Sequence, residues 1–423
     1  YFGACRYSVM ISNLEKFFTG CLHLSSPWEV TNVKMDEGQT RVDIRVRNNG
    51  KFEFFCLECK GRCQGYDKKE REWQHSDLFD MECHIHCAVD RMKCRGCGKV
   101  TMIDVPWAEK GSGFTLLFEA KGIELMREMP VKAAGSFLKT EPHRLWRVLD
   151  RFVERRMKHQ NLAGLTRFYV DETACRRGHN YISIFADEDH NIIFMTYGND
   201  ASTVTRFREH LEKHGGKAEN IEYICCDMGK GFQSGIAMEF PKAIATYDRF
   251  HVMEHMSMAV DRSRRHEWNM LRENGRLKEA TDLKGQRFIL LRNNENLSGN
   301  QQSRVRNILN SHREIGIVYG LKEPLRDTWD FTNRYDAADH LVAATNTGIG
   351  ALRDILKLVD NHFNEILNWF DSGMSNGVTE GINSVIQAVK GRARGFRDWR
   401  NLRTMCYLRS SGLCDPIIRP CPN

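Results

Sequence analysis

The chain has 423 residues, of which 41% are hydrophobic and 28% are charged, and its formal net charge at neutral pH is +7. These values are typical of an ordinary soluble globular protein with two to four domains. No apolar run reaches the roughly 18–20 residues of a membrane span, and the N-terminus lacks a charged-then-apolar secretory pattern, so we expect no membrane partner. The 15 cysteines include close pairs, which favour reduced thiols and a metal over disulfides and indicate the cytosol.

Short strands are predicted over 30–35 and 40–47, where apolar and polar residues alternate between turn sequences. Two cysteine pairs follow, Cys56-x-x-Cys59 and Cys94-x-x-Cys97. Each pair can form a tight turn that directs both thiolates at one tetrahedral zinc ion, so we expect a structural zinc site. The 34 residues between the pairs exceed what a minimal ribbon needs, which predicts an inserted hairpin that brings the pairs together. The alternative is four ordinary buried cysteines.

The run Cys83-His84-Ile85-His86-Cys87 lies between the two pairs. A second zinc site, or an exchange of ligands into the first, is one interpretation of this run. We prefer a simpler one, a strand with partly buried cysteines and surface histidines.

Residues 114–158 follow a helical period. We predict a helix over 114–129 that Pro130 ends, a short helix over 131–138, and a third helix from an N-cap at Thr140 to about Lys158. Basic residues share one face of the third helix and are expected to bind DNA: Arg144, Arg147, Arg151, Arg155 and Lys158. A short helix, a tight turn and a longer basic helix predict a helix-turn-helix whose second helix enters the major groove. The alternative is a solvated amphipathic helix in a linker.

From residue 165 the pattern becomes rich in strands. The predicted elements are strands over 167–170, 181–186 and 191–196, a helix over 201–214, a strand over 221–226, a helix over 231–239, a strand over 243–247 and a helix from Val252. Three strands followed by alternating helices and strands are typical of the ribonuclease-H-like fold, a mixed α/β sheet with right-handed crossovers.

Three acidic residues are the candidate catalytic groups. Asp171 is expected to close the first of these strands and Asp227 the fourth, and the two strands are neighbours in such a sheet, so their carboxylates would meet. Glu380 opens a helix expected to run to about Arg409, and Asn383, one turn later, steadies the carboxylate or contacts DNA. Two-metal phosphoryl transfer requires oxygen ligands around a pair of Mg²⁺ ions about 3.5–4 Å apart. A lone strand-ending Asp is more often a turn residue, but two of them in neighbouring strands favour the metal site.

The segment after Glu380 is strongly basic. Its expected phosphate contacts are Lys390, Arg392, Arg394 and Arg397, and the further basic residues are Arg400, Arg403 and Arg409. A solvated charged face is the alternative.

We expect five segments: an N-terminal β-rich zinc-binding domain over 1–110, a helix-turn-helix over 111–160, the first part of the catalytic core over 161–255, a mostly helical insertion over 256–373, and the C-terminal part of the core over 374–423. The insertion includes a helix expected over 351–370. Trp268 and Trp329 of the insertion either stack on a flipped base or pack in its core.

At these residues the sequence resembles the insertion-sequence transposases of the ISL-three family, and the resemblance covers almost the whole chain. The matching motifs include the cysteine pairs, Asp171-Glu172-Thr173, Arg177-Gly178-His179-Asn180-Tyr181, Asp227-Met228, Asp248-Arg249-Phe250-His251-Val252 and Glu380-Gly381-Ile382-Asn383. Each motif is weak by itself, but their joint order is specific.

The resemblance implies a bacterial enzyme of the DDE type that binds terminal inverted repeats, cleaves the element ends and joins the 3′ hydroxyls to target DNA. It implies that Asp171, Asp227 and Glu380 hold two Mg²⁺ or Mn²⁺ ions, and that the partners are double-stranded DNA and a second copy of the chain, at the bacterial nucleoid. Arg249 and His251 match a motif with a role near the scissile phosphate or in packing. Gly229, where the family often has Ser, is interpreted as tuning of the loop.

Two alternatives to an active transposase remain at this point. A DNA-binding protein derived from a transposase would keep the fold without cutting DNA, but the intact acidic triad argues against it. A metal-dependent nuclease would hydrolyse DNA at the same site, and only strand-transfer products separate it from a transposase.

Overall fold

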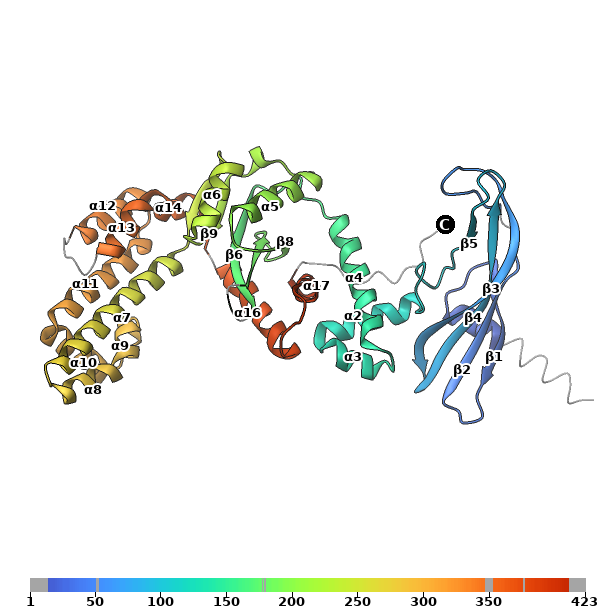
Figure 1. Cartoon of the computed structure of the whole chain (residues 1–423), viewed down its shortest axis with the longest axis horizontal. Helices are drawn as coiled ribbons and strands as arrows, with labels where there is room; N and C mark the ends of the chain where they lie inside the picture. The colour runs from blue at the N-terminus through green and yellow to red at the C-terminus, as the bar shows by residue number, and fades with distance from the viewer. Residues whose placement is uncertain are drawn as a thin grey trace, which may run out of the picture. The chain divides into compact units, whose positions relative to one another are not determined.

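The computed structural model describes residues 14–410 except 51–52, 177, 179, 347–352 and 376. The motif residues Arg177 and His179, and the first two residues of the helix expected over 351–370, therefore lie outside the described residues. The chain divides into two compact units, the first ending at Glu154 and the second beginning at Arg155 (Figure 1). Among the described residues, no helix combines the length and apolar composition that a membrane span requires.

A five-stranded sheet forms most of the first unit, after a helix over residues 14–21. Its strands are β1 (Trp28–Met35), β2 (Arg41–Asn48), β3 (Cys63–Leu78), β4 (Met81–Cys94) and β5 (Val100–Met102). The order is β1-β2-β4-β3, with β5 beside β4. Alternate residues of β2 and β4 point into the core, as the period of a half-buried strand requires. The inserted hairpin predicted between the cysteine pairs is β3–β4, in which Cys63 pairs with Cys94.

Three helices follow the sheet: α2 (Leu116–Glu128), α3 (Val131–Phe137) and α4 (Pro142–Lys158). The first unit ends within α4, after Glu154. The three predicted helices are confirmed to within two residues at each boundary. The N-cap of α2 is Thr115, whose side chain accepts a hydrogen bond from the Phe118 N–H. The N-cap predicted at Thr140 is wrong, because α4 begins two residues later at Pro142, a residue suited to the first helical position since it has no N–H to satisfy.

A second five-stranded sheet lies in the second unit, in the order β10-β9-β6-β7-β8. Its strands are β6 (Arg167–Arg176), β7 (Asn180–Ala186), β8 (Ile192–Tyr197), β9 (Tyr223–Cys226) and β10 (Ile244–Tyr247). The first three strands are antiparallel, and β9 and β10 run parallel to β6. The predicted adjacency of the first and fourth strands, β6 and β9, is confirmed.

The expectation that Asp171 closes its strand is wrong. β6 continues to Arg176 because it forms a long antiparallel hairpin with β7, in which Asp171 pairs with Ile184. Its pairing with β9, by contrast, ends at Val170 and Cys226. Asp171 is therefore the first residue of β6 beyond the end of β9.

Helices cover both faces of this sheet (Figure 1). α5 (Ala201–Lys213) and α6 (Lys230–Glu239) pack on one face with a short 3-10 turn, η1 (Ala218–Asn220), between them. α16 (Gly377–Ala393) contacts β6, and α17 (Trp399–Ser410) contacts β8. The single helix expected from Glu380 to Arg409 is wrong: Arg394 and Gly395 have φ angles of 53° and 93°, and these left-handed residues end α16.

The remaining elements form a helical part with its own hydrophobic core. They are α7 (Arg249–Glu273), α8 (Leu277–Gly285), α9 (Arg287–Leu291), η2 (Asn294–Asn296), α10 (Gly299–Ser311), α11 (Arg313–Asp327), η3 (Thr328–Asp330), α12 (Arg334–Thr345), α13 (Arg353–Asn361), α14 (Phe363–Leu367) and α15 (Trp369–Ser372). The helix expected over 351–370 is three short helices, interrupted at His362, whose φ is −126°, and at Asn368. Trp329 is buried in this core and Trp268 packs against it, which favours the packing interpretation.

Candidate catalytic site and metal centre

Asp171 lies on the face of the second sheet that α16 covers. Phe168 and Val170 point to the opposite face, into the core with α5 and α6, so the alternation of the strand directs Asp171 towards α16. The Asp171 side chain is only 7% exposed. Its Oδ1 accepts a hydrogen bond of 2.7 Å from the Glu172 N–H, and its Oδ2 accepts one of 2.8 Å from Asn383 Nδ2 of α16.

Asp227 follows β9 directly and so lies at the same end of the sheet as Asp171. Its Oδ1 accepts a hydrogen bond of 2.9 Å from the Gly229 N–H. A Cβ atom on residue 229 would lie 2.9 Å from that oxygen, so a side chain there would displace the carboxylate. Glycine at this position is therefore compatible with the observed orientation of Asp227.

Negative charge is concentrated around these two carboxylates. The pKa of Asp171 is raised to about 6, mainly by burial and also by the negative charges of Asp227 and Glu172. The hydrogen bond from the Glu172 N–H and the charge of His251 lower this pKa and offset part of the increase. Burial and Asp227 also raise the pKa of Glu172, against a hydrogen bond from Asn199. A buried carboxylate beside others of the same charge is typical of a site that a cation completes.

Glu380 is exposed on α16, one helical turn before Asn383. Within the described part of the chain, the carboxylates of Asp171, Asp227 and Glu380 do not all lie within 4.8 Å of one another. The Oδ1 atom of Asn383 is buried and accepts no hydrogen bond from the described residues. The donors at this end of the sheet are therefore carboxylate and amide oxygens, one of them unsatisfied, and such hard donors suit Mg²⁺ or Mn²⁺.

Further side chains of α16 follow β6 beyond Asp171. Gln387 Nε2 donates to Thr173 Oγ1 at 3.3 Å, and Lys390 Nζ donates to the Ala174 carbonyl at 2.5 Å. Burial lowers the pKa of Lys390. Lys390, expected to contact phosphate, thus has its ammonium group committed within the chain, because it lies on the helix face that carries Asn383 and Gln387.

Two polar residues of this region, Glu172 and Asn199, were not assigned a role from the sequence. Glu172 and Asn199 interact with each other beside Asp171, and the only signal for Glu172 was its place in the Asp-Glu-Thr motif. His251 is in the first turn of α7, and Arg249 of the same turn is exposed. The electrostatic effect of His251 on Asp171 indicates that this turn faces the carboxylates.

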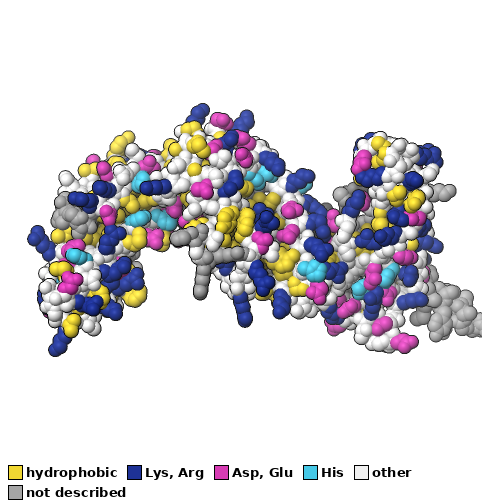
Figure 2. All heavy atoms as spheres, viewed as in Figure 1, with side chains coloured by type: hydrophobic (Ala, Val, Ile, Leu, Met, Phe, Trp, Pro, Cys, Tyr) yellow, Lys and Arg dark blue, Asp and Glu magenta, His cyan; other side chains and the backbone are white. Residues whose placement is uncertain are grey.

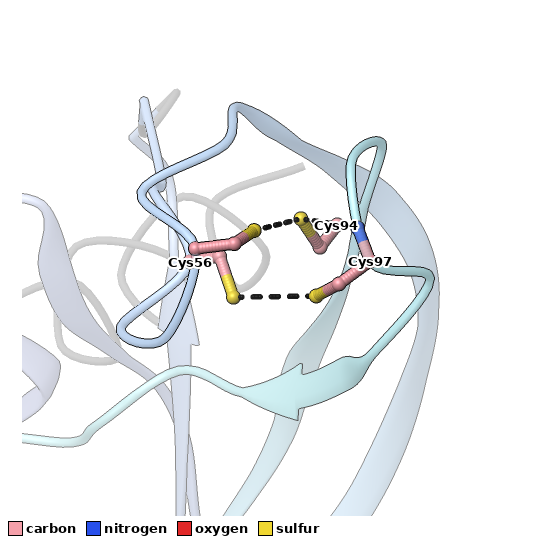
Figure 3. A group of neighbouring side chains, drawn as sticks. Cys56, Cys94 and Cys97 are labelled. Atoms are coloured by element: carbon pink, nitrogen blue, oxygen red, sulfur yellow. Dashed lines mark hydrogen bonds between the residues drawn. The ribbon is translucent and has the colours of Figure 1, made fainter.

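The four cysteines of the two pairs come together in the first unit. Their Sγ atoms all lie within 4.8 Å of one another, with Cys56 and Cys97 3.7 Å apart and Cys59 and Cys94 3.4 Å apart. Figure 3 shows the sulfur atoms of two facing loops pointing towards each other. A tetrahedral zinc with Zn–S bonds of about 2.3 Å separates its sulfurs by about 3.8 Å. The cluster therefore fits a structural zinc ion.

The backbone around the cysteines supports the same chemistry. The Cys94 Sγ accepts hydrogen bonds from the N–H groups of Gly96 and Cys97, at 3.3 and 3.5 Å. These and other neighbouring donors lower the pKa of Cys94 to about 6, and the N–H of Cys97 has the largest effect. The lowered pKa favours the thiolate that a zinc ion binds. A Cβ on Gly61 would lie 3.3 Å from the sulfurs of Cys59 and Cys94, so glycine gives the cluster its space.

The Cys-His-Ile-His-Cys run is part of a strand, as the simpler interpretation has it, but its histidine side chains are largely covered rather than on the surface. Cys83 and Cys87 are buried in the core of the first sheet, and burial raises the pKa of both thiols to about 12. His84 Nδ1 lies 2.7 Å from Glu72, and His86 Nε2 lies 2.6 Å from Asp43 Oδ1. The cysteines and histidines thus point to opposite faces of β4, because successive side chains alternate along a strand.

The expected DNA-contacting residues of α4 divide into two groups. Arg144 lies over the Phe114 ring at 4.1 Å, and Arg151 pairs with Glu119 at 2.5 Å, so both contact the rest of the first unit. Arg147 and Arg155 are exposed. Figure 2 shows Lys and Arg side chains along the surface that α4 forms. In the second unit, Arg392, Arg394 and Arg397 are also exposed.

Comparison with known proteins identifies the class. The family model described as "Transposase" matches residues 169–406, and that of the helix-turn-helix domain of transposase family ISL3 matches residues 103–153. The transposase for insertion sequence element IS1001 of Bordetella parapertussis is 25% identical over 371 residues, which cover 86% of this chain and 90% of that protein. The transposase for insertion sequence element IS1557 of Mycobacterium tuberculosis is 24% identical over 431 residues, which cover 94% of this chain and 96% of that protein. The chain belongs to the ISL3 family of transposases.

Proposed function

We propose that this transposase binds the terminal inverted repeats of its insertion sequence, cleaves the element ends and joins the 3′ hydroxyls to target DNA. Asp171, Asp227 and Glu380 are its proposed catalytic carboxylates. The observation that carries this proposal is the hydrogen bond from Asn383 to Asp171, because it ties the helix of Glu380 to the strand beside Asp227.

A ribonuclease-H-like catalytic core is part of the proposal. The order β10-β9-β6-β7-β8, with three antiparallel strands followed by two parallel ones, supports it. We propose that the core comprises 161–255 and 374–423, that 256–373 is an insertion, and that the zinc-binding domain and the helix-turn-helix occupy 1–110 and 111–160.

The proposed chemistry is phosphoryl transfer. Asp171, Asp227 and Glu380 would hold two Mg²⁺ or Mn²⁺ ions, which when bound activate the attacking oxygen and stabilise the leaving oxygen. Asn383 orients the Asp171 carboxylate through its amide N–H, and the Gly229 N–H orients that of Asp227. Burial of Asp171 keeps bulk water from this side of the site, which strengthens its interaction with a cation.

DNA recognition is assigned to two basic surfaces. The proposed DNA contacts are Arg147 and Arg155 on α4 and Arg392, Arg394 and Arg397 after Glu380. Arg144 and Arg151 support the first surface and Lys390 the second, through their contacts within the chain. Asn383 orients the Asp171 carboxylate beside the second surface. The four-cysteine cluster would hold a structural zinc ion that stabilises the open end of the β3–β4 hairpin, where Cys63 pairs with Cys94. Two element ends must be cut together, so we propose a homodimer acting at the nucleoid.

Cleavage of the protein's own element tests the proposal. DNA carrying the flanks of the coding gene is incubated with purified protein and Mg²⁺ or Mn²⁺, beside Asp227→Asn, and the products are mapped to the nucleotide. Metal-dependent 3′-hydroxyl ends at inverted repeats, absent with the variant, together with strand-transfer products, support the transposase. Tight binding of the flanks without cleavage under either metal would instead indicate a silent DNA-binding protein, and hydrolysis without joining a nuclease.

A further inference from the structure

Two partly exposed aromatic side chains contact each other where β8 ends and α17 begins. Tyr197 ends β8 and is 44% exposed, and Trp399 is the first residue of α17. Their ring centroids are 6.0 Å apart at an interplanar angle of 48°. The Tyr197 side chain therefore presents a large aromatic surface to solvent, beside a second ring that it contacts.

The register of the sheet places Tyr197 on the same face as Asp171. Tyr197 pairs with Ile182 of β7, and Ile182 pairs with Thr173 of β6, two residues after Asp171. Directly paired residues on neighbouring antiparallel strands point to the same face. Tyr197 is two strands away from β6 and two residues further along it than Asp171, which places the Cα atoms of Tyr197 and Asp171 about 12 Å apart. This distance is about three or four base steps along one DNA strand.

The aromatic pair is held in place by its neighbours. The Tyr197 hydroxyl donates a hydrogen bond of 2.6 Å to Asn180 Oδ1, which restricts rotation of the ring. Arg403 lies over the Trp399 ring at 5.2 Å, and its Nε is buried without a hydrogen-bond partner among the described residues. Arg206 donates to the Tyr197 carbonyl at 2.7 Å.

The surroundings of the pair are basic. The arginines close to it in sequence or in contact with it are Arg206, Arg397, Arg400 and Arg403, and the nearby acidic residues are Asp200 and Asp398. Aromatic rings among arginines bind single-stranded nucleic acid, because bases stack on the rings while arginines contact the phosphates. A base within a duplex has both faces covered, so the pair fits an unpaired base.

We propose that Tyr197 and Trp399 form a stacking site for an unpaired base of the DNA strand that is cleaved at Asp171 and Asp227. This inference rests on the proposed function, because it assumes that the carboxylates act on DNA. The site would hold the strand a few nucleotides from the scissile phosphate and keep it separated from its complement.

Fluorescence of a base analogue tests the stacking site. The probe is a duplex with an unpaired 3′ extension that contains 2-aminopurine, compared with the blunt duplex of the same sequence and with the full-length protein. We expect quenching of the analogue and tighter binding of the extended duplex. Trp399→Ala and Tyr197→Ala should each lower affinity for the extended duplex by roughly 5- to 100-fold, as loss of one stacked base predicts, with blunt-duplex affinity unchanged.

Matched variants separate this result from unfolding and from failure of the proposed catalysis. Tyr335→Ala removes a tyrosine that is 82% exposed on α12 and should change neither affinity. Trp399→Phe keeps an aromatic ring and should retain most of the preference for the extended duplex. This variant replaces Trp399→Ala in the test if thermal melts show that Trp399→Ala does not fold. Equal affinity of the wild-type protein for both duplexes overturns the proposal. An equal loss of affinity for both duplexes in Trp399→Ala also overturns it, and would indicate that Trp399 contacts duplex DNA or the protein itself. Asp227→Asn should still bind the extended duplex more tightly than the blunt one, because it changes no part of the stacking site. If the wild-type protein shows this preference but never cleaves DNA, only the catalytic proposal is refuted.

Discussion

Asn383 Nδ2 donates a hydrogen bond of 2.8 Å to Asp171 Oδ2, and the two residues are 212 positions apart in the sequence. The bond joins α16 to β6. It fixes the helix that contains Glu380 relative to the first acidic residue of the proposed triad. The other carboxylate oxygen of Asp171 accepts the Glu172 N–H, so both oxygens are oriented by the protein.

Replacement of Asn383 tests whether this residue orients the carboxylate or contacts DNA. Asn383→Ala should lower metal affinity and cleavage by about 10- to 100-fold, as loss of a group that orients a metal ligand does, with end binding unchanged. Calorimetric metal titration and a cleavage assay measure the effect. Gln387→Ala, which removes a neighbouring contact of the same helix face to Thr173, is the control. Normal cleavage combined with weakened DNA binding would assign Asn383 to DNA instead.

Removal of the Asp171 charge should stabilise the metal-free protein. The pKa of Asp171 is raised from 3.8 to about 6 by burial, so the folded state keeps a proton that the unfolded chain has already released. The stability contribution of this group therefore falls as pH rises from about 4 to about 6, and the full cost persists above that range. Two pKa units correspond to about 3 kcal/mol, which the hydrogen bonds lost by an amide partly offset.

Denaturant unfolding at neutral pH in a chelator checks this expectation. Asp171→Asn should raise the free energy of unfolding by about 1–3 kcal/mol, and the gain should vanish near pH 4. Added Mg²⁺ should narrow the difference, because a cation stabilises only the charged form. Asp189→Asn, at an exposed turn, serves as the control and should have little effect. A destabilised Asp171→Asn in the absence of metal would contradict the electrostatic account.

Zinc content should depend on Cys94 and not on Cys63. Both residues are buried in the same small cluster, but only Cys94 belongs to the group of four converging sulfurs. Cys94→Ser should therefore lose the zinc ion, and Cys63→Ser should retain it. Elemental analysis of the dialysed proteins measures the difference. Equal zinc in wild type and Cys94→Ser would refute the four-cysteine site.

Two arginines of α4 should behave differently although both lie on its basic face. Arg147 is exposed, so Arg147→Ala should weaken DNA binding and reduce the slope of affinity against salt by about 1. Arg151 pairs with Glu119, whose side chain is nearly buried, so Arg151→Ala should mainly destabilise the fold, by about 1–3 kcal/mol. Salt titrations of end binding and thermal unfolding distinguish the two outcomes. The same salt slope in Arg147→Ala as in wild type would remove Arg147 from the interface.

Local patterns in the sequence determined the elements and the chemistry of this protein. Alternating apolar residues predicted the strands that became β1 and β2, a strand-rich pattern predicted β6, β7 and β8, and the spacing of the cysteine pairs predicted the sulfur cluster. These inferences succeeded because side-chain periodicity and the reach of a short loop are local properties of the chain.

Tertiary structure alone decided the details of the site. β6 runs past Asp171 because β7 pairs with it, and Lys390 contacts Ala174 rather than solvent because α16 lies against β6. α16 ends after Ala393 because Arg394 and Gly395 form a left-handed turn. Arg144 and Arg151 contact Phe114 and Glu119, about 30 residues away in the sequence. Side-chain exposure and hydrogen-bond partners follow from packing between segments more than 200 residues apart, such as Asp171 and Asn383, which no local pattern encodes.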